Sequence, residues 1–85
     1  MTKSICQYCG SSWKIENEHI KPKSRGGVTT INACQNCNQS KGDKTLLTWF
    51  RWLKKNDRYR WQRIKKFQYR KRGKIAETCR KVANE

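Results

Sequence analysis

The chain has 85 residues, of which 21 are lysine or arginine and 6 are aspartate or glutamate, giving a net charge of +15 and a pI near 10.1. Only 34% of its residues are hydrophobic, which excludes a large apolar core and leaves no stretch long enough to span a bilayer. The N-terminus has no apolar run typical of a signal peptide, so we expect a protein that is not secreted and that works in the cytoplasm, of a cell or of a phage host.

The positive charge is concentrated in the second half of the chain. Residues 1–45 carry seven basic and three acidic side chains (+4), and residues 46–85 carry fourteen basic and three acidic ones (+11). Such an excess favours a polyanionic partner, with nucleic acid first. An acidic membrane is less favoured because the basic stretch lacks a Leu/Phe-rich insertion face. We expect a core over 1–45 and a basic helical extension over 46–85 within one compact domain.

Two C-x2-C pairs, Cys6/Cys9 and Cys34/Cys37, are the strongest motif in the chain. Four thiolates in this arrangement can supply the tetrahedral ligands of a closed structural Zn²⁺ site. Disulfides are the alternative, but they are rare in reducing cytosol. A redox C-x-x-C normally occurs singly and in an α/β pattern that this chain lacks. We therefore predict a zinc knuckle over residues 1–15, with Gly10 in a left-handed turn.

A β-hairpin and a helix are predicted between the knuckle and the extension. Residues 13–20 and 28–33 have the composition of two short strands. Pro22 and Gly26-Gly27 predict the turn between them. A helix is expected from Cys34 to Gly42, where the glycine ends it.

After Asp43 the pattern becomes helical. Thr45 is a suitable N-cap for a first helix, which Asn56-Asp57 interrupts. A second helix starts at Asp57 and runs to the break at 70–73, and a third covers 75–83. The residues at the spacing of a buried helix face are Leu46, Trp49, Phe50, Leu53, Trp61, Ile64 and either Phe67 or Gln68. Aromatic residues among lysine and arginine can also stack on bases, but we predict that Trp49, Phe50 and Trp61 form the core. Cys79 is predicted to be a small buried apolar residue.

Glu18-His19, Asn32 and Asn38 are the polar groups that these structural assignments leave over. A lone histidine is usually a surface or a satisfied core residue, and an asparagine before a cysteine turn is commonly a cap. Here the single histidine follows a carboxylate directly, and a hairpin can bring two oxygen ligands beside its ring.

In order along the chain, CQYCG, EHIKPKSRGG, Asn32 and CQNCNQSKGD resemble the pattern of the HNH endonuclease family. The resemblance covers residues 5–44, about half of the chain. It implies a ββα-metal fold, a small α+β architecture that holds one divalent ion between hairpin and helix. It also implies cleavage of DNA phosphodiester bonds to 5′-phosphate and 3′-hydroxyl ends, and nicking is the expected first product.

The resemblance also implies roles for individual residues. His19 would be the general base, and Glu18 and Asn38 would ligate the catalytic ion. Asn32 would orient the imidazole through its side chain or backbone. Oxygen ligands suit Mg²⁺ or Mn²⁺. Many members have Asp at the position of Glu18 and His at the position of Asn38. We therefore expect this site to discriminate weakly between divalent ions.

Basic side chains in the predicted loop and helices are candidates for contacts with DNA phosphates. They are Lys21, Lys23, Arg25, Lys41, Arg51, Arg58, Arg60, Arg63 and Lys66. The alternative function is a zinc-ribbon DNA-binding module without catalysis. Neither function fixes the oligomeric state, and a monomer or a weak homodimer fits both.

Overall fold

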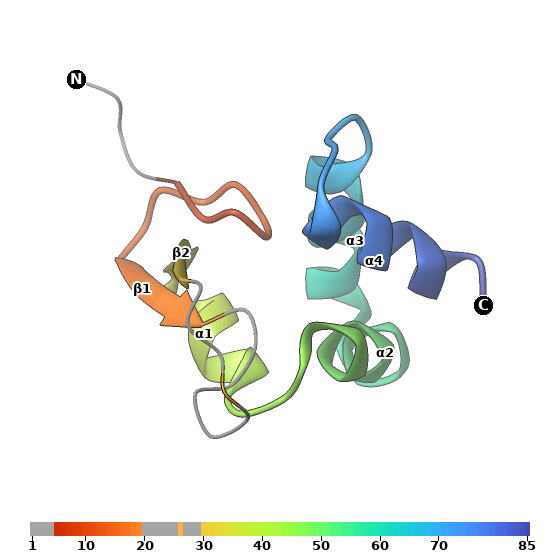
Figure 1. Cartoon of the computed structure of the whole chain (residues 1–85), viewed down its shortest axis with the longest axis horizontal. Helices are drawn as coiled ribbons and strands as arrows, with labels where there is room; N and C mark the ends of the chain where they lie inside the picture. Colours follow the sequence, from red (N-terminus) through yellow and green to blue (C-terminus); the bar gives the residue numbers. More distant parts are fainter. Residues whose placement is uncertain (1–4, 20–25, 27–29) are drawn as a thin grey trace.

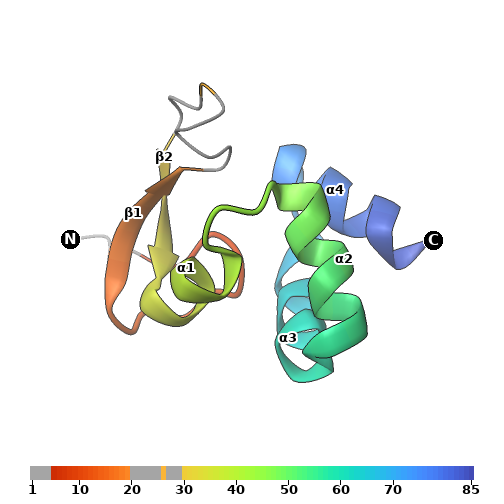
Figure 2. The ribbon, with the colours of Figure 1, turned by 90° about the horizontal axis from the view of Figure 1, so that it is seen from below.

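The fold is a small α+β arrangement, as predicted. The computed structural model describes residues 5–19, 26 and 30–85. The elements, in chain order, are β1 (Ile15–His19), β2 (Thr30–Cys34), α1 (Gln35–Lys41), α2 (Leu46–Asn56), α3 (Arg58–Gln68) and α4 (Lys74–Ala83). In Figures 1 and 2 the hairpin and α1 lie on one side of the molecule, and α2, α3 and α4 lie on the other.

The two strands form an antiparallel sheet whose register runs from Ile15 opposite Cys34 to His19 opposite Thr30. β1 begins at Ile15, two residues later than predicted. Lys14 has a φ of +47°, which is not an extended conformation, so the strand can begin only after it. β2 begins at Thr30 and continues to Cys34. In the predicted turn, Gly26 has a φ of +80°, whereas Pro22 and Gly27 lie outside the described residues.

Helix boundaries follow the predicted capping residues. The Thr45 side chain accepts a hydrogen bond from the Thr48 amide (3.3 Å) and begins α2. Asp57 ends α2 and caps α3, accepting from the Arg60 amide at 3.2 Å. Gly42, with a φ of +52°, ends α1. The three helices predicted after Asp43 are therefore confirmed.

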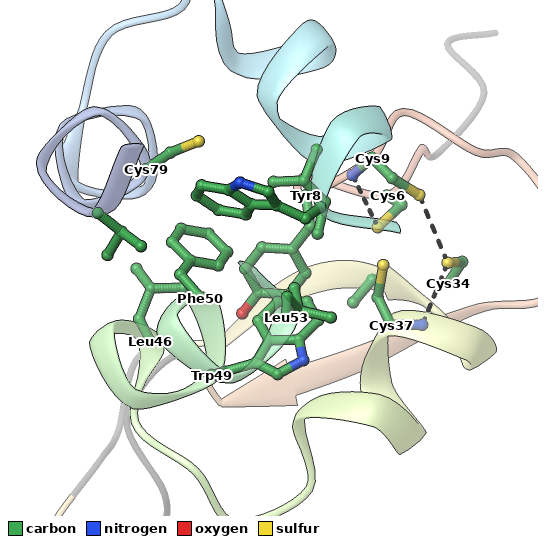
Figure 3. Close-up of a cluster of buried hydrophobic side chains, with 14 residues drawn as sticks. Cys6, Tyr8, Cys9, Cys34, Cys37, Leu46, Trp49, Phe50, Leu53 and Cys79 are labelled. Carbon is green, nitrogen blue, oxygen red and sulfur yellow. Dashed lines mark hydrogen bonds between the residues drawn. The ribbon is translucent and has the colours of Figure 1, made fainter. Parts of the chain in front are cut away.

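The core is one cluster of buried side chains to which both halves of the chain contribute. Trp49, Phe50 and Trp61 are buried, as predicted, with ring centroids 5.4 Å apart for Trp49 and Phe50 and 5.7 Å apart for Phe50 and Trp61. Tyr8 packs edge-on against Trp49, with centroids 4.9 Å apart. Figure 3 shows this ring cluster beside the cysteines. Cys79 is buried on α4, as predicted, and burial raises the pKa of its thiol.

Hydrogen bonds and a close backbone contact hold the zinc knuckle against α3. Gln68 donates from Nε2 to the carbonyls of Gln7 (2.6 Å) and Tyr8 (3.1 Å). Gly10 has a φ of +80°, and a Cβ there would lie 2.6 Å from the Phe67 ring. The knuckle therefore needs glycine both for its turn and for its contact with α3. Among Phe67 and Gln68, which the sequence left open, Gln68 is the buried one.

Candidate functional site

The four cysteines predicted to bind zinc lie together. The Sγ atoms of Cys6, Cys9, Cys34 and Cys37 are all within 4.8 Å of one another, and all four residues are buried. Cys9 Sγ and Cys34 Sγ are 3.7 Å apart, close to the ~3.8 Å edge of a tetrahedron with Zn–S bonds of about 2.3 Å. None of the four is in a disulfide. The donor set and its spacing fit zinc.

Local backbone geometry brings the thiols together (Figure 3). The amides of Cys9 and Cys37 each donate to the first cysteine of their own pair, Cys6 and Cys34, at 3.5 Å. Hydrogen bonds with Cys37 and Cys9 lower the pKa of Cys6, whereas the hydrogen bond with Cys6 raises the pKa of Cys37. Deprotonation of Cys6 is thus favoured at the expense of Cys37. Binding of Zn²⁺ would remove this conflict by releasing the remaining protons.

Arg60 joins α3 to the cysteine cluster. Its Nη1 donates to Cys37 Sγ at 3.2 Å, and its Nε lies 3.9 Å from Asp57 Oδ2. Only 18% of the Arg60 side chain is exposed. A guanidinium at this distance stabilises thiolate charge. Arg60 was a candidate DNA contact, but in the structure its guanidinium donates a hydrogen bond to Cys37 of the cysteine cluster.

Glu18 is buried near the end of β1, and its carboxylate makes two polar contacts. Tyr8 donates its hydroxyl to Glu18 Oε2 at 2.6 Å, and Lys41 Nζ lies 3.0 Å from Oε1. Burial first, and the contact with Glu18 second, raise the pKa of the Tyr8 phenol, so Tyr8 stays a donor at any working pH. Lys41 is fully buried. The prediction that Lys41 contacts DNA is therefore wrong, because the ion pair holds its ammonium inside the fold.

Asn38 and Lys41 extend from α1 towards β1. Asn38 Nδ2 donates to Glu16 Oε1 at 2.7 Å. Asn38 therefore contacts Glu16, and Lys41, one turn further along the helix, contacts Glu18. Carboxylate and amide oxygens are the ligands that Mg²⁺ and Mn²⁺ prefer. Among the described residues, Oε1 of Glu18 accepts no hydrogen bond of regular geometry and has Lys41 as its ion-pair partner. Glu18 and Asn38 therefore offer oxygen donors of the type that a hard divalent ion prefers, and Glu18 already has Lys41 as its ion-pair partner.

His19 and Asn32 are diagonal neighbours in the ladder, since His19 pairs with Thr30 and Asn32 lies two residues further along β2. The His19 side chain is outside what the structure describes. Asn32 is half-buried, and its carbonyl accepts from the Gln7 amide at 2.8 Å. That carbonyl therefore holds the knuckle against β2.

The other predicted DNA contacts differ in how accessible they are. Lys21, Lys23 and Arg25 lie outside the described residues. Arg51 is exposed but forms an ion pair with Glu85 near the C-terminus. The exposed basic residues of α3 are Arg58, Arg63 and Lys66.

Sequence reasoning missed the polar neighbours of Glu18. Tyr8 was counted only as part of the knuckle, and Glu16 was not considered. Glu16 and Glu18 have the two-residue spacing that puts strand side chains on one face, and this was the available signal for Glu16. The contact between Tyr8 and Glu18 had no local signal, because it depends on how the knuckle packs on the hairpin.

A model of a protein family described as HNH endonuclease matches residues 6–49, slightly more than half of the chain. The chain belongs to the HNH endonuclease family. Membership in the HNH family supports nuclease activity, a hydrolase chemistry, at the level of the family. Comparison with curated proteins and with solved structures gives no match. Within the described part of this HNH protein, no helix is both long and apolar enough to cross a membrane.

The buried ion pair gives a stability prediction. Lys41→Met should lower the free energy of unfolding by about 3–5 kcal/mol, because it leaves the Glu18 carboxylate buried without its cation. The double variant Glu18→Gln/Lys41→Met removes both charges and should recover most of the loss. Urea unfolding of the zinc-loaded proteins, followed by tryptophan fluorescence, measures this. Equal stability of Lys41→Met and the parent would show that the pair is not formed in solution.

Proposed function

We propose that the protein is an endonuclease that hydrolyses DNA phosphodiester bonds at one site, built from Glu18 and His19 at the end of β1 and Asn38 on α1. Zinc in the cysteine cluster has a structural role in this proposal. A Mg²⁺ or Mn²⁺ ion held by Glu18 and Asn38 is the catalytic cofactor. The products would be 5′-phosphate and 3′-hydroxyl ends, and one site per chain would cut one strand at a time.

The chemistry requires a base, because water attacks phosphorus only as it loses a proton. His19 is suited to accept this proton since an imidazole titrates near neutral pH. Asn32 is a diagonal neighbour of His19 in the ladder, and its side chain would hold the ring in one tautomer. When bound, the divalent ion would supply charge neutralisation at phosphorus and at the departing 3′ oxygen.

The observation that carries the proposal is the burial of Glu18 directly before His19. A carboxylate that is only 6% exposed is costly unless it is compensated. Here Tyr8 and Lys41 fix it at 2.6 and 3.0 Å, facing the helix that carries Asn38. A carboxylate fixed in this way is a preorganised ligand, and a DNA-binding module alone would not need it.

The same ion pair is the one feature that favours the non-catalytic alternative. The Lys41 ammonium lies 3.0 Å from Glu18 Oε1. It neutralises the negative charge of the Glu18 carboxylate, which would otherwise attract a metal ion. If the ion pair fully replaces the metal, the chain is a zinc-stabilised DNA-binding module. Metal dependence of cleavage therefore separates the two functions.

The zinc-loaded protein should nick supercoiled plasmid when Mg²⁺ or Mn²⁺ is added and should not do so without either ion. Asn38→Ala should raise the ion concentration needed for half-maximal nicking by about tenfold, since one amide ligand is lost. Gln39→Ala, its exposed neighbour on α1, is the matched control and should leave the titration unchanged. Nicking that needs no added divalent ion, or an unchanged requirement in Asn38→Ala, would contradict the assignment of this metal site.

A further inference from the structure

Helix α3 has two opposite faces of different character. Its buried face is formed by Trp61, Ile64 and Gln68. On the opposite face, Tyr59, Arg63 and Lys66, and then Arg70 in the turn just after α3, recur at spacings of four, three and four residues, and all four are exposed. This spacing places them in one stripe along the helix. Three of the four stripe residues are basic, and α3 contains no acidic residue, so the stripe is positively charged.

A groove of about 650 Å³ runs between this stripe and the zinc knuckle at Cys9. The residues of α3 and its C-terminal end that line it are Tyr59, Arg63, Lys66, Phe67, Tyr69 and Arg70. No carboxylate occurs among its described lining residues. Tyr59 and Tyr69 are 75% and 77% exposed, which is unusual for rings of this size. The groove thus combines cations with uncovered aromatic rings.

We infer that this groove, called here the α3 groove, binds a short unpaired segment of single-stranded DNA. Positive charge selects a polyanion. Lysine and arginine alone suffice for the phosphates of a duplex, whereas exposed rings gain stacking energy only from bases that are not already paired and stacked. Ten residues of helix separate the two tyrosines by about 15 Å, which is about four nucleotides at the ~3.4 Å spacing of stacked bases.

This inference rests on the proposed function in one respect, because it names the substrate as DNA with an unpaired segment near the cut. The groove itself is formed by α3 and the knuckle, and none of its lining residues belongs to the proposed active site. Binding at the groove and cleavage can therefore fail independently.

Fluorescence anisotropy with a labelled oligonucleotide, as a single strand and as its duplex, tests the inference. The zinc-loaded protein is used at one fixed salt concentration and without Mg²⁺ or Mn²⁺, so that no cleavage occurs. Tyr59→Ala/Tyr69→Ala should weaken binding of the single strand by at least about tenfold, because stacking on a tyrosine is worth about 1–3 kcal/mol per base. Duplex binding should change by less than about twofold.

Two control variants complete the test. Tyr59→Phe/Tyr69→Phe keeps both rings and should retain single-strand affinity. Trp13→Ala removes an aromatic residue that is 51% exposed outside the groove, and it should have no effect. Circular dichroism and zinc content establish that each variant is folded. Equal losses for single strand and duplex, or no loss for either, would overturn the inference, whatever the outcome of the nicking assay.

Discussion

Cys34→Ser is expected to lose both the zinc ion and the native fold. In wild type, Cys34 Sγ lies 3.7 Å from Cys9 Sγ, and Cys34 is the N-cap of α1, so this thiol joins the knuckle to the start of α1. Binding of structural zinc contributes about 10–16 kcal/mol, whereas the whole stability of a domain is typically about 5–15 kcal/mol. Loss of the zinc ion is therefore expected to unfold this small chain.

Elemental analysis and circular dichroism of the purified variant measure the effect. Wild type should contain one zinc ion per chain, and Cys34→Ser should contain none and lose most of its helical signal. Cys79→Ser is the matched control, because Cys79 is equally buried but lies on α4 outside the cluster. It should keep its zinc. Zinc-free wild type, or a Cys34→Ser variant with a native spectrum, would show that the cluster is not a structural metal site.

His19→Ala is expected to reduce plasmid nicking by about 10²–10⁴-fold, which is the usual contribution of a general base. Zinc content and DNA affinity should remain near those of wild type, since the change lies outside the cysteine cluster and adds no charge at neutral pH. Asn17→Ala, an exposed position two residues earlier on the same strand, is the control and should retain activity. Nicking by purified His19→Ala at the wild-type rate would require a different base or favour the non-catalytic alternative.

Local signals in the sequence predicted most of the fold. The caps at Thr45 and Asp57 and the helical spacing of Trp49, Phe50 and Trp61 depend only on nearby residues, so α2 and α3 were found within one or two residues. The C-x2-C pairs predicted the cysteine cluster differently, because the ligand requirement of zinc brings two distant pairs together. Lys14, whose positive φ delays the start of β1, gave no such signal.

Contacts between distant segments could not be predicted in this way. Lys41 looked like a surface cation, and only the packing of α1 on the hairpin buries it against Glu18. Arg60 lies 23 residues from Cys37 in the sequence, yet it donates to the cysteine sulfur. In both cases the charge was visible in the sequence, but its partner became evident only once the fold had brought them together.

We propose that Glu18, His19 and Asn38 form a hydrolytic site for DNA. The most direct measurement is a time course of supercoiled plasmid with zinc-loaded wild type and His19→Ala, with Mg²⁺ or Mn²⁺ added, followed by treatment of the product with DNA ligase. We expect wild type to produce nicked circles that ligase reseals, because the ends are 5′-phosphate and 3′-hydroxyl, and His19→Ala to produce almost none. Equal nicking by both proteins, or nicks that ligase cannot seal, would contradict the account.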